Sequence, residues 1–192
     1  MHTIRGLQAV KADKTLRLAM LLHDVGKPLS KTTDAEGIDH FYGHGDKGAD
    51  LARKILRRLR FDNDTTDRVV RLVRVHDNRI EPEAKYLRRA MSRIGADLFP
   101  DLLTLKQADL DAQSEYLRSE KQMHLDRLKI LYEAVSSQKD CVCLQDLAIS
   151  GSDLIEAGMR PGPQLGEMLA RLLELVIEEP ARNNRQWLLE QA

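Results

Sequence analysis

Residues 16–27 are the stretch that most restricts how this chain can fold. The first part of the stretch is apolar on nearly every side of a helix, and a helix of that kind is normally buried. The stretch then ends in His23 and Asp24, followed by Gly26 and Lys27. Because a carboxylate next to a core is costly unless it is paired or bound to a metal, something in the fold must satisfy Asp24.

Apolar residues recur at helical spacing along most of the chain, and strand signals are nearly absent, so the sequence predicts an all-α fold. Gly26 and Pro28 are expected to end the helix that carries His23. Residues 32–42 are predicted as an irregular loop or a weak hairpin, residues 136–143 as a polar linker, and Asn183 as the cap of a final helix ending near residue 189. The helix that carries His23 covers residues 15–25, and the other predicted helices cover residues 3–10, 44–58, 64–78, 82–94, 98–117, 121–135, 153–157 and 163–177.

Charge and cysteine content exclude several classes of protein. The formal net charge is +0, so no global field attracts nucleic acid or a membrane, although residues 53–93 are basic and residues 140–192 acidic. Cys141 and Cys143 are too few for a disulfide framework and poorly spaced for zinc. No apolar run is long enough to span a bilayer and no signal peptide is recognised, so we expect a cytoplasmic protein without a membrane partner.

Helical periodicity turns several His and Asp side chains toward the core. A single buried His is more often simply hydrogen-bonded, and a single inward Asp is usually an ion-pair or cap partner. Several together would each need a separate polar partner, whereas one shared metal ion satisfies them all. Imidazole with carboxylate favours a divalent transition metal (Ni, Co, Mn, Fe or Zn) over magnesium. The side chains placed inward are His23, Asp24, His44, His76 and Asp109; the face of His2 is mixed, and Asp111 falls on the polar side.

The order of these residues resembles the His…His-Asp…Asp signature of the HD phosphohydrolase superfamily, carried here by His2, His23-Asp24 with Gly26-Lys27, and Asp109. Further segments resemble the C-terminal, HD-containing half of bacterial tRNA nucleotidyltransferases, the family of CCA-adding enzymes and poly(A) polymerases. These segments are His40-Phe-Tyr-Gly-His44 with Gly48-Ala49, and residues 107–113, 146–154 and 161–166. The resemblance runs along essentially the whole chain.

The resemblance implies an HD-domain helical bundle in residues 1–136 and a small C-terminal helical domain in residues 137–192. It implies a metal-dependent phosphohydrolase acting on a phosphomonoester or a 2′,3′-cyclic phosphodiester, such as one at an RNA end. In that interpretation Asp24 and Lys27 are catalytic, with Lys27 neutralising phosphate charge. The implied ligands of one metal are His2, His23, Asp24 and Asp109, while His44 and His76 would bind a second metal or the substrate phosphate.

One part of the family's machinery is not recognised in this chain. Nucleotide addition in that family uses an N-terminal domain with a Gly-Ser motif, an Asp-x-Asp metal pair and a nucleotide-reading segment. We therefore expect no nucleotidyl transfer from this chain alone. A chain that begins one residue before its first expected ligand also resembles a fragment.

Two other functions stay open. The helices could be a non-catalytic body that docks tRNA in the full-length enzyme, or a two-iron oxygenase could use the same ligands. The helix beginning at Pro163 offers an N-terminus that can hold a phosphate, although an ordinary helix start explains it equally well. Solvated helix faces are the simpler explanation of the basic stretch. The candidates for contact with an RNA backbone are Arg57, Arg58, Arg68, Arg71 and Arg160.

Overall fold

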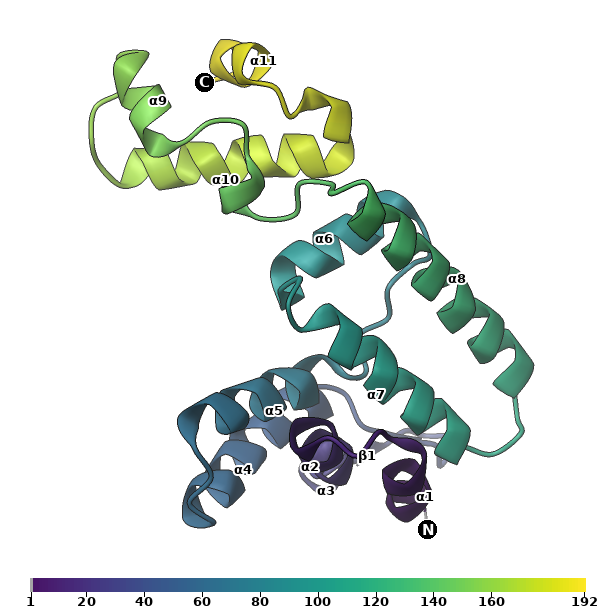
Figure 1. Ribbon diagram of the computed structural model, residues 1–192. Coiled ribbons are helices and arrows are strands. Elements are labelled where there is room, and N and C mark those ends of the chain that lie inside the picture. The colour runs from purple at the N-terminus through teal and green to yellow at the C-terminus, as the bar shows by residue number, and fades with distance from the viewer. Residues whose placement is uncertain (1) are drawn as a thin grey trace. The chain divides into compact units, whose positions relative to one another are not determined.

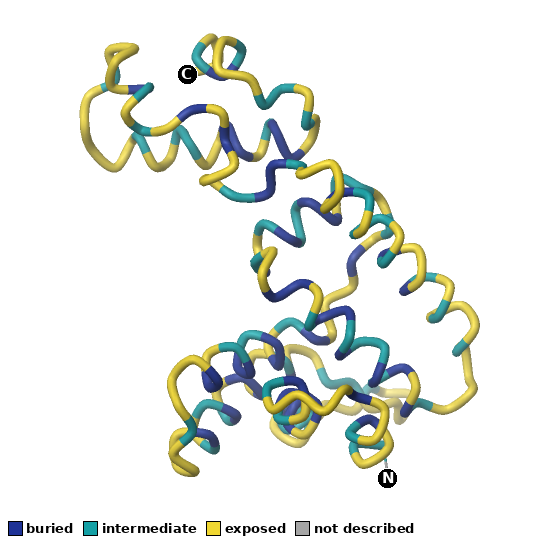
Figure 2. The backbone as a smooth tube through the Cα atoms, viewed as in Figure 1, coloured by how far each residue is buried: buried dark blue, intermediate teal, exposed yellow. Residues whose placement is uncertain are grey.

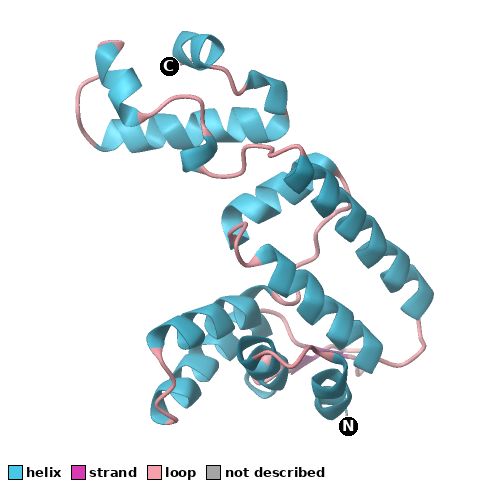
Figure 3. Ribbon diagram, in the orientation of Figure 1, coloured by secondary structure: helices cyan, strands magenta, loops and turns pink. Residues whose placement is uncertain are grey.

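The computed structural model describes residues 2–192, and it confirms a mostly helical fold, with 67% of residues in helices and 2% in strands (Figures 1 and 3). The first half contains α1 (His2–Ala9), α2 (Lys14–Leu22), α3 (Lys27–Ser30), β1 (Thr32–Thr33), β2 (Asp39–His40), α4 (His44–Arg58), α5 (Asn63–Val75) and α6 (Ala84–Ile94). The second half contains α7 (Phe99–Ala112), α8 (Arg118–Ser137), α9 (Gly151–Glu156), α10 (Pro163–Glu178), α11 (Arg185–Glu190) and the 3-10 turns η1 (Leu144–Asp146) and η2 (Pro180–Arg182).

The chain forms two compact units that alternate along the sequence. The first unit comprises residues 1–79 and 97–126, and the second comprises residues 80–96 and 127–192. The domain boundary expected at residue 136 stays a prediction, because compact units defined by contacts need not coincide with domains.

In the first unit, α4 packs on α5, α1 packs on α7, and α2 packs on both α5 and α7. Buried residues recur at helical spacing along α4 and α5, as the spacing of their apolar residues predicts (Figure 2). Asp13 caps α2 by accepting a hydrogen bond from Leu16 N, and Asp62 caps α5 by accepting one from Thr65 N. This packing brings the C-terminal ends of α2 and α5 and the start of α4 toward α7.

The second unit has a core of its own, in which α10 packs on α6, α9, η1 and η2. Arg88 is buried here and donates hydrogen bonds to Asp140 and to the carbonyl of Ile177. The buried residues of this core include Cys141, Leu147, Ile149, Leu154, Leu172, Leu173, Val176, Ile177 and Leu188.

The structure corrects several local predictions. The helix predicted over residues 98–117 ends at Ala112, and the one predicted over residues 64–78 ends at Val75. The helix predicted to run to residue 25 ends at Leu22, and Pro28 lies in the first turn of α3, where its missing N–H is not needed. The cap of the final helix is Asn184, while the side chain of Asn183 bonds to the backbone of Asp146 and Ala148 instead.

Residues 32–42, predicted as an irregular loop or a weak hairpin, form the weak hairpin. Its antiparallel register pairs Thr32 with His40 and Thr33 with Asp39. Within residues 2–192, none of the helices is long and apolar enough to cross a membrane.

Candidate metal centre

Each of three buried histidines is fixed in the same way. His23 and His76 follow the last residues of α2 and α5, and His44 opens α4. Their Nδ1 atoms lie 2.8, 2.7 and 2.9 Å from the carbonyl oxygens of Met20, Val73 and Phe41, each three residues earlier. A carbonyl can only accept, so Nδ1 must carry the proton in each ring. This leaves Nε2 with a lone pair, and a hydrogen bond at the other nitrogen is how metal-binding histidines are usually oriented.

These Nε2 atoms face one another in pairs. His44 Nε2 lies 3.1 Å from His76 Nε2, and His23 Nε2 lies 3.3 Å from His2 Nε2. In the His44–His76 pair, where both Nδ1 atoms carry the proton, two lone pairs at this distance repel unless a cation or a proton lies between them. Two nitrogens bound to one ion at about 2.1 Å, with tetrahedral or octahedral angles, lie about 3.0–3.4 Å apart. The donor atoms therefore fit metal ligation.

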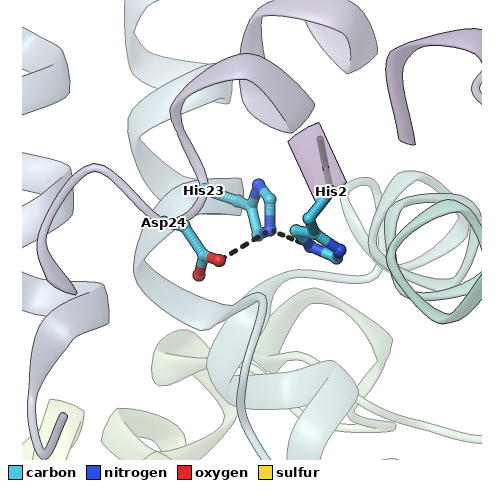
Figure 4. Close-up of side chains that lie close together, drawn as sticks. All are labelled: His2, His23 and Asp24. Carbon is cyan, nitrogen blue, oxygen red and sulfur yellow. Dashed lines mark hydrogen bonds and ion pairs between the residues drawn. The ribbon is translucent and has the colours of Figure 1, made fainter. Parts of the chain in front are cut away.

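Asp24 lies at the centre of the cluster. Its Oδ2 is 3.4 Å from His23 Nε2 and 2.7 Å from Lys27 Nζ, while Oδ1 is 3.8 Å from His44 Nε2 and 3.7 Å from His76 Nε2. Figure 4 shows His23 between Asp24 and His2. Two triads can each hold a metal ion and share this carboxylate: His2, His23 and Asp24, and Asp24, His44 and His76.

Asp109 on α7 completes the cluster. Its Oδ1 lies 2.8 Å from His2 Nε2 and 3.3 Å from His23 Nε2, and its Oδ2 accepts a hydrogen bond from Gln113. Asp111, two residues later, is exposed, as predicted from the helical phase. The structure thus brings together His2, His23, Asp24, Lys27, His44, His76 and Asp109.

Two glycines allow the turn after α2, the start of α4 and the end of α5 to approach closely enough to form the cluster. A Cβ added at Gly26 would lie 2.1 Å from the carbonyl O of His44 and 2.5 Å from the N of Gly48. A Cβ at Gly45 would lie 2.6 Å from the carbonyl O of Arg74. All three neighbours are backbone atoms, so the turn after α2, the start of α4 and the end of α5 can meet only if these positions lack a side chain.

Electrostatics keep both carboxylates ionised. Burial raises the pKa of Asp24, but the nearby His76 ring and the hydrogen bond from Lys27 outweigh burial and hold that pKa well below its usual range. Burial also raises the pKa of Asp109, but the hydrogen bond from His23 outweighs burial and lowers that pKa. Burial lowers the pKa of His23, but the bond to Asp109 and the charge of Asp24 outweigh this and raise it. In the absence of a metal, the cluster therefore favours a proton on His23.

Lys106 is a functional candidate that the sequence reasoning missed. It lies one helical turn before Asp109 on α7, and its Nζ donates to the carbonyls of His76 and Asn78. Burial lowers the pKa of Lys106, and the charges of Asp77 and Asp109 oppose the shift. The bond fixes the backbone at the end of α5, where His76 is carried. The sequence could have indicated Lys106 by its spacing of three residues from Asp109, because residues at that spacing lie on the same face of a helix.

The cluster opens into a cavity of about 710 Å³. Lys27, Gln113, Ser114 and Lys121 are among its polar lining residues, and the hairpin adds a wall. This wall consists of His40, Phe41 and Tyr42. The sequence analysis had not predicted these three residues as part of the site.

The proposed RNA-contacting arginines differ in their surroundings. Arg57 and Arg58 lie exposed in the last turn of α4, and Arg160 is exposed between α9 and α10. Arg68 pairs with Asp101 at 2.7 Å, and Arg71 pairs with Asp97 at 3.3 Å. The guanidinium groups of Arg68 and Arg71 are thus already engaged by carboxylates.

Comparison with known proteins finds relatives for most of the chain. Residues 44–192 match the family described as tRNA nucleotidyltransferase domain 2, putative. The chain is 41% identical over 164 residues to the CC-adding tRNA nucleotidyltransferase of Thermus thermophilus, covering 84% of this chain and 36% of that protein. It is 34% identical over 170 residues to the A-adding tRNA nucleotidyltransferase of Deinococcus radiodurans, covering 85% of this chain and 38% of that protein. The chain thus spans little more than a third of the length of these relatives.

Proposed function

Because this chain belongs to the tRNA nucleotidyltransferase domain 2 family, we propose that it is the HD-type, metal-dependent phosphohydrolase module of a tRNA-processing enzyme. The observation that carries the proposal is the cluster around Asp24, in which Nε2 atoms of four histidines converge on two carboxylates. The proposed substrate is a phosphomonoester or a 2′,3′-cyclic phosphodiester. Nucleotide addition is not assigned to this chain alone.

The proposed ligand set follows the two triads. His2, His23 and Asp24, with Asp109 beside them, would hold one divalent ion. His44 and His76 would hold a second ion with Asp24 or contact the substrate phosphate. Imidazole and carboxylate donors favour nickel, cobalt, manganese, iron or zinc over magnesium. When bound, the metal would polarise the phosphoryl oxygens and lower the pKa of a water molecule.

The chain's own residues supply the remaining chemistry in this proposal. Lys27 is half-exposed to the cavity and holds Asp24 at 2.7 Å, so its ammonium can neutralise a phosphate that enters beside the cluster. Hydrogen bonds from Nδ1 to backbone carbonyls keep the rings of His23, His44 and His76 turned inward before substrate arrives. With no Ser or Cys nucleophile proposed, water would attack the phosphorus directly. The P–O bond to the ester oxygen then breaks, and that oxygen leaves as a hydroxyl after taking up a proton.

Metal removal tests this function. Chelation is expected to reduce hydrolysis of 2′,3′-cyclic AMP to background, and added nickel, cobalt or manganese is expected to restore it better than magnesium does. His44→Ala should prevent the recovery, whereas His124→Ala, a histidine outside the cluster, should leave it intact. Hydrolysis that survives chelation, or none with any metal, would overturn the phosphohydrolase proposal.

A second candidate function is docking of tRNA without catalysis by this part. The observation that favours it is the pair Arg57 and Arg58, which are exposed and have no carboxylate partner within residues 2–192. Such cations can neutralise phosphates of any tRNA. Arg160, before the N-terminus of α10, is proposed as a further contact.

The two arginine pairs allow a matched comparison. The double variant Arg57→Gln, Arg58→Gln is expected to weaken binding of unrelated tRNAs about equally and to reduce the slope of log affinity against log salt by about two. Arg68→Gln with Arg71→Gln should have a smaller effect, because Asp101 and Asp97 already bind these groups. Filter-binding at several salt concentrations measures both. A flat salt response in the unmodified protein would contradict the docking proposal.

A further inference from the structure

The hairpin places two stacked rings at the wall of the cavity. The His40 and Tyr42 rings are 5.2 Å apart between centroids, with planes inclined by only 9°. Both residues line the same cavity as Asp24 and His76, and Tyr42 is 77% exposed. One face of Tyr42 is therefore occupied by His40, and the rest of the ring is accessible from the cavity and solvent.

Hydrogen bonds hold His40, the supporting ring of this pair, in place. His40 Nε2 lies 2.7 Å from Asp34 Oδ2, and Asp34 also accepts from the backbone N–H groups of Glu36 and Ile38. The backbone of His40 pairs with Thr32 in the hairpin. Tyr42 thus stacks on an anchored ring, which reduces the entropy lost when a ligand stacks on Tyr42.

The same short segment carries a proposed ligand of the phosphate or metal. Tyr42 is two residues before His44, and the carbonyl of Phe41 accepts a hydrogen bond from His44 Nδ1. Lys27 Nζ lies 5.9 Å from the centroid of the Phe41 ring and also binds Asp24. A ligand whose phosphate reaches the cluster therefore has the ring of Tyr42 on the wall of the same cavity.

We infer that Tyr42, supported by His40, is a stacking platform for the base of a nucleotide whose phosphate lies at the Asp24 cluster. The cavity of about 710 Å³ is far larger than a phosphate group needs and falls within the usual range for ligand-sized sites. Aromatic rings stack on every base and so give affinity without sequence selection. The inference rests on the proposed function for the position of the phosphate, and it assigns the substrate class as nucleotides or a terminal nucleotide of RNA.

Two ligands that differ only in the base separate stacking from phosphate binding. We expect AMP to bind about tenfold more tightly than ribose 5-phosphate, as base–aromatic stacking commonly provides. Calorimetric titration in chelator-containing buffer measures both affinities without metal-dependent turnover. Binding does not require hydrolysis, so a failure of the proposed function leaves this measurement valid.

Matched tyrosine variants test the platform itself. Tyr42→Leu should weaken AMP about tenfold and leave ribose 5-phosphate unchanged, while Tyr42→Phe keeps the ring and should retain affinity. Tyr116→Leu is the control, because Tyr116 is 78% exposed but does not line the cavity. In hydrolysis of 2′,3′-cyclic AMP, Tyr42→Leu should raise KM and leave kcat nearly unchanged. Equal affinities for AMP and ribose 5-phosphate, no detectable AMP binding, or equal losses in Tyr42→Leu and Tyr116→Leu would overturn the inference.

Discussion

Asp24→Asn is expected to reduce hydrolysis of 2′,3′-cyclic AMP by about a thousandfold and to weaken metal binding, because both proposed metal triads share this carboxylate. Charge stabilisation by a bound metal contributes several kcal/mol, and each 1.4 kcal/mol or so corresponds to about tenfold in rate. Asparagine keeps the volume of the side chain but removes its charge. Steady-state assays with the metal-loaded protein measure the rate, and calorimetric titration with nickel measures the affinity.

Two further variants make this result interpretable. Asp109→Asn removes the other carboxylate of the cluster and should also weaken metal binding, whereas Asp111→Asn alters an exposed carboxylate on the same helix and should not. Thermal unfolding of each variant separates loss of the site from loss of the fold. Activity that persists unchanged in pure Asp24→Asn protein would contradict the metal-centre proposal.

Gly26→Ala is expected to destabilise the protein by about 3 kcal/mol, which lowers the Tm by about 10 °C for a chain of this size. The added Cβ would lie 2.1 Å from the carbonyl O of His44 and 2.9 Å from the Cα of Gly48, and these backbone atoms cannot move independently. The φ of Gly26 is −81°, which alanine adopts freely, so the variant tests the contact alone. Separation of Asp24 from His44 should also weaken metal binding.

A second glycine gives the matched control. Gly166 lies inside α10, and an added Cβ there meets no atom within 4 Å. Gly166→Ala should therefore stabilise the protein by about 0.5–1 kcal/mol through helix propensity. If Gly26→Ala left both the Tm and the nickel affinity unchanged, the close approach of α4 to the turn at Gly26 would not be needed for the site.

The sequence by itself determined the helical class and the direction of the key side chains. Apolar residues at helical spacing placed His76 on the buried side at the end of α5 and Asp109 opposite the exposed Asp111 on α7; His76 is buried just after the last residue of α5, and Asp111 is exposed. The reason is that a helix buried on one side has apolar residues at helical spacing in its own sequence. The bounds of α4 were predicted to the residue for the same reason.

Only the tertiary structure decided which of these side chains meet. Periodicity describes one helix at a time, so it could not show that His44 and His76 come within 3.1 Å, or that glycine contacts permit it. It also could not show that backbone carbonyls fix the Nδ1 proton of each buried histidine, or that Lys106 secures the end of α5. The ion pairs that engage Arg68 and Arg71 likewise join residues distant in sequence. These contacts depend on how the helices pack, which the sequence of each helix does not record.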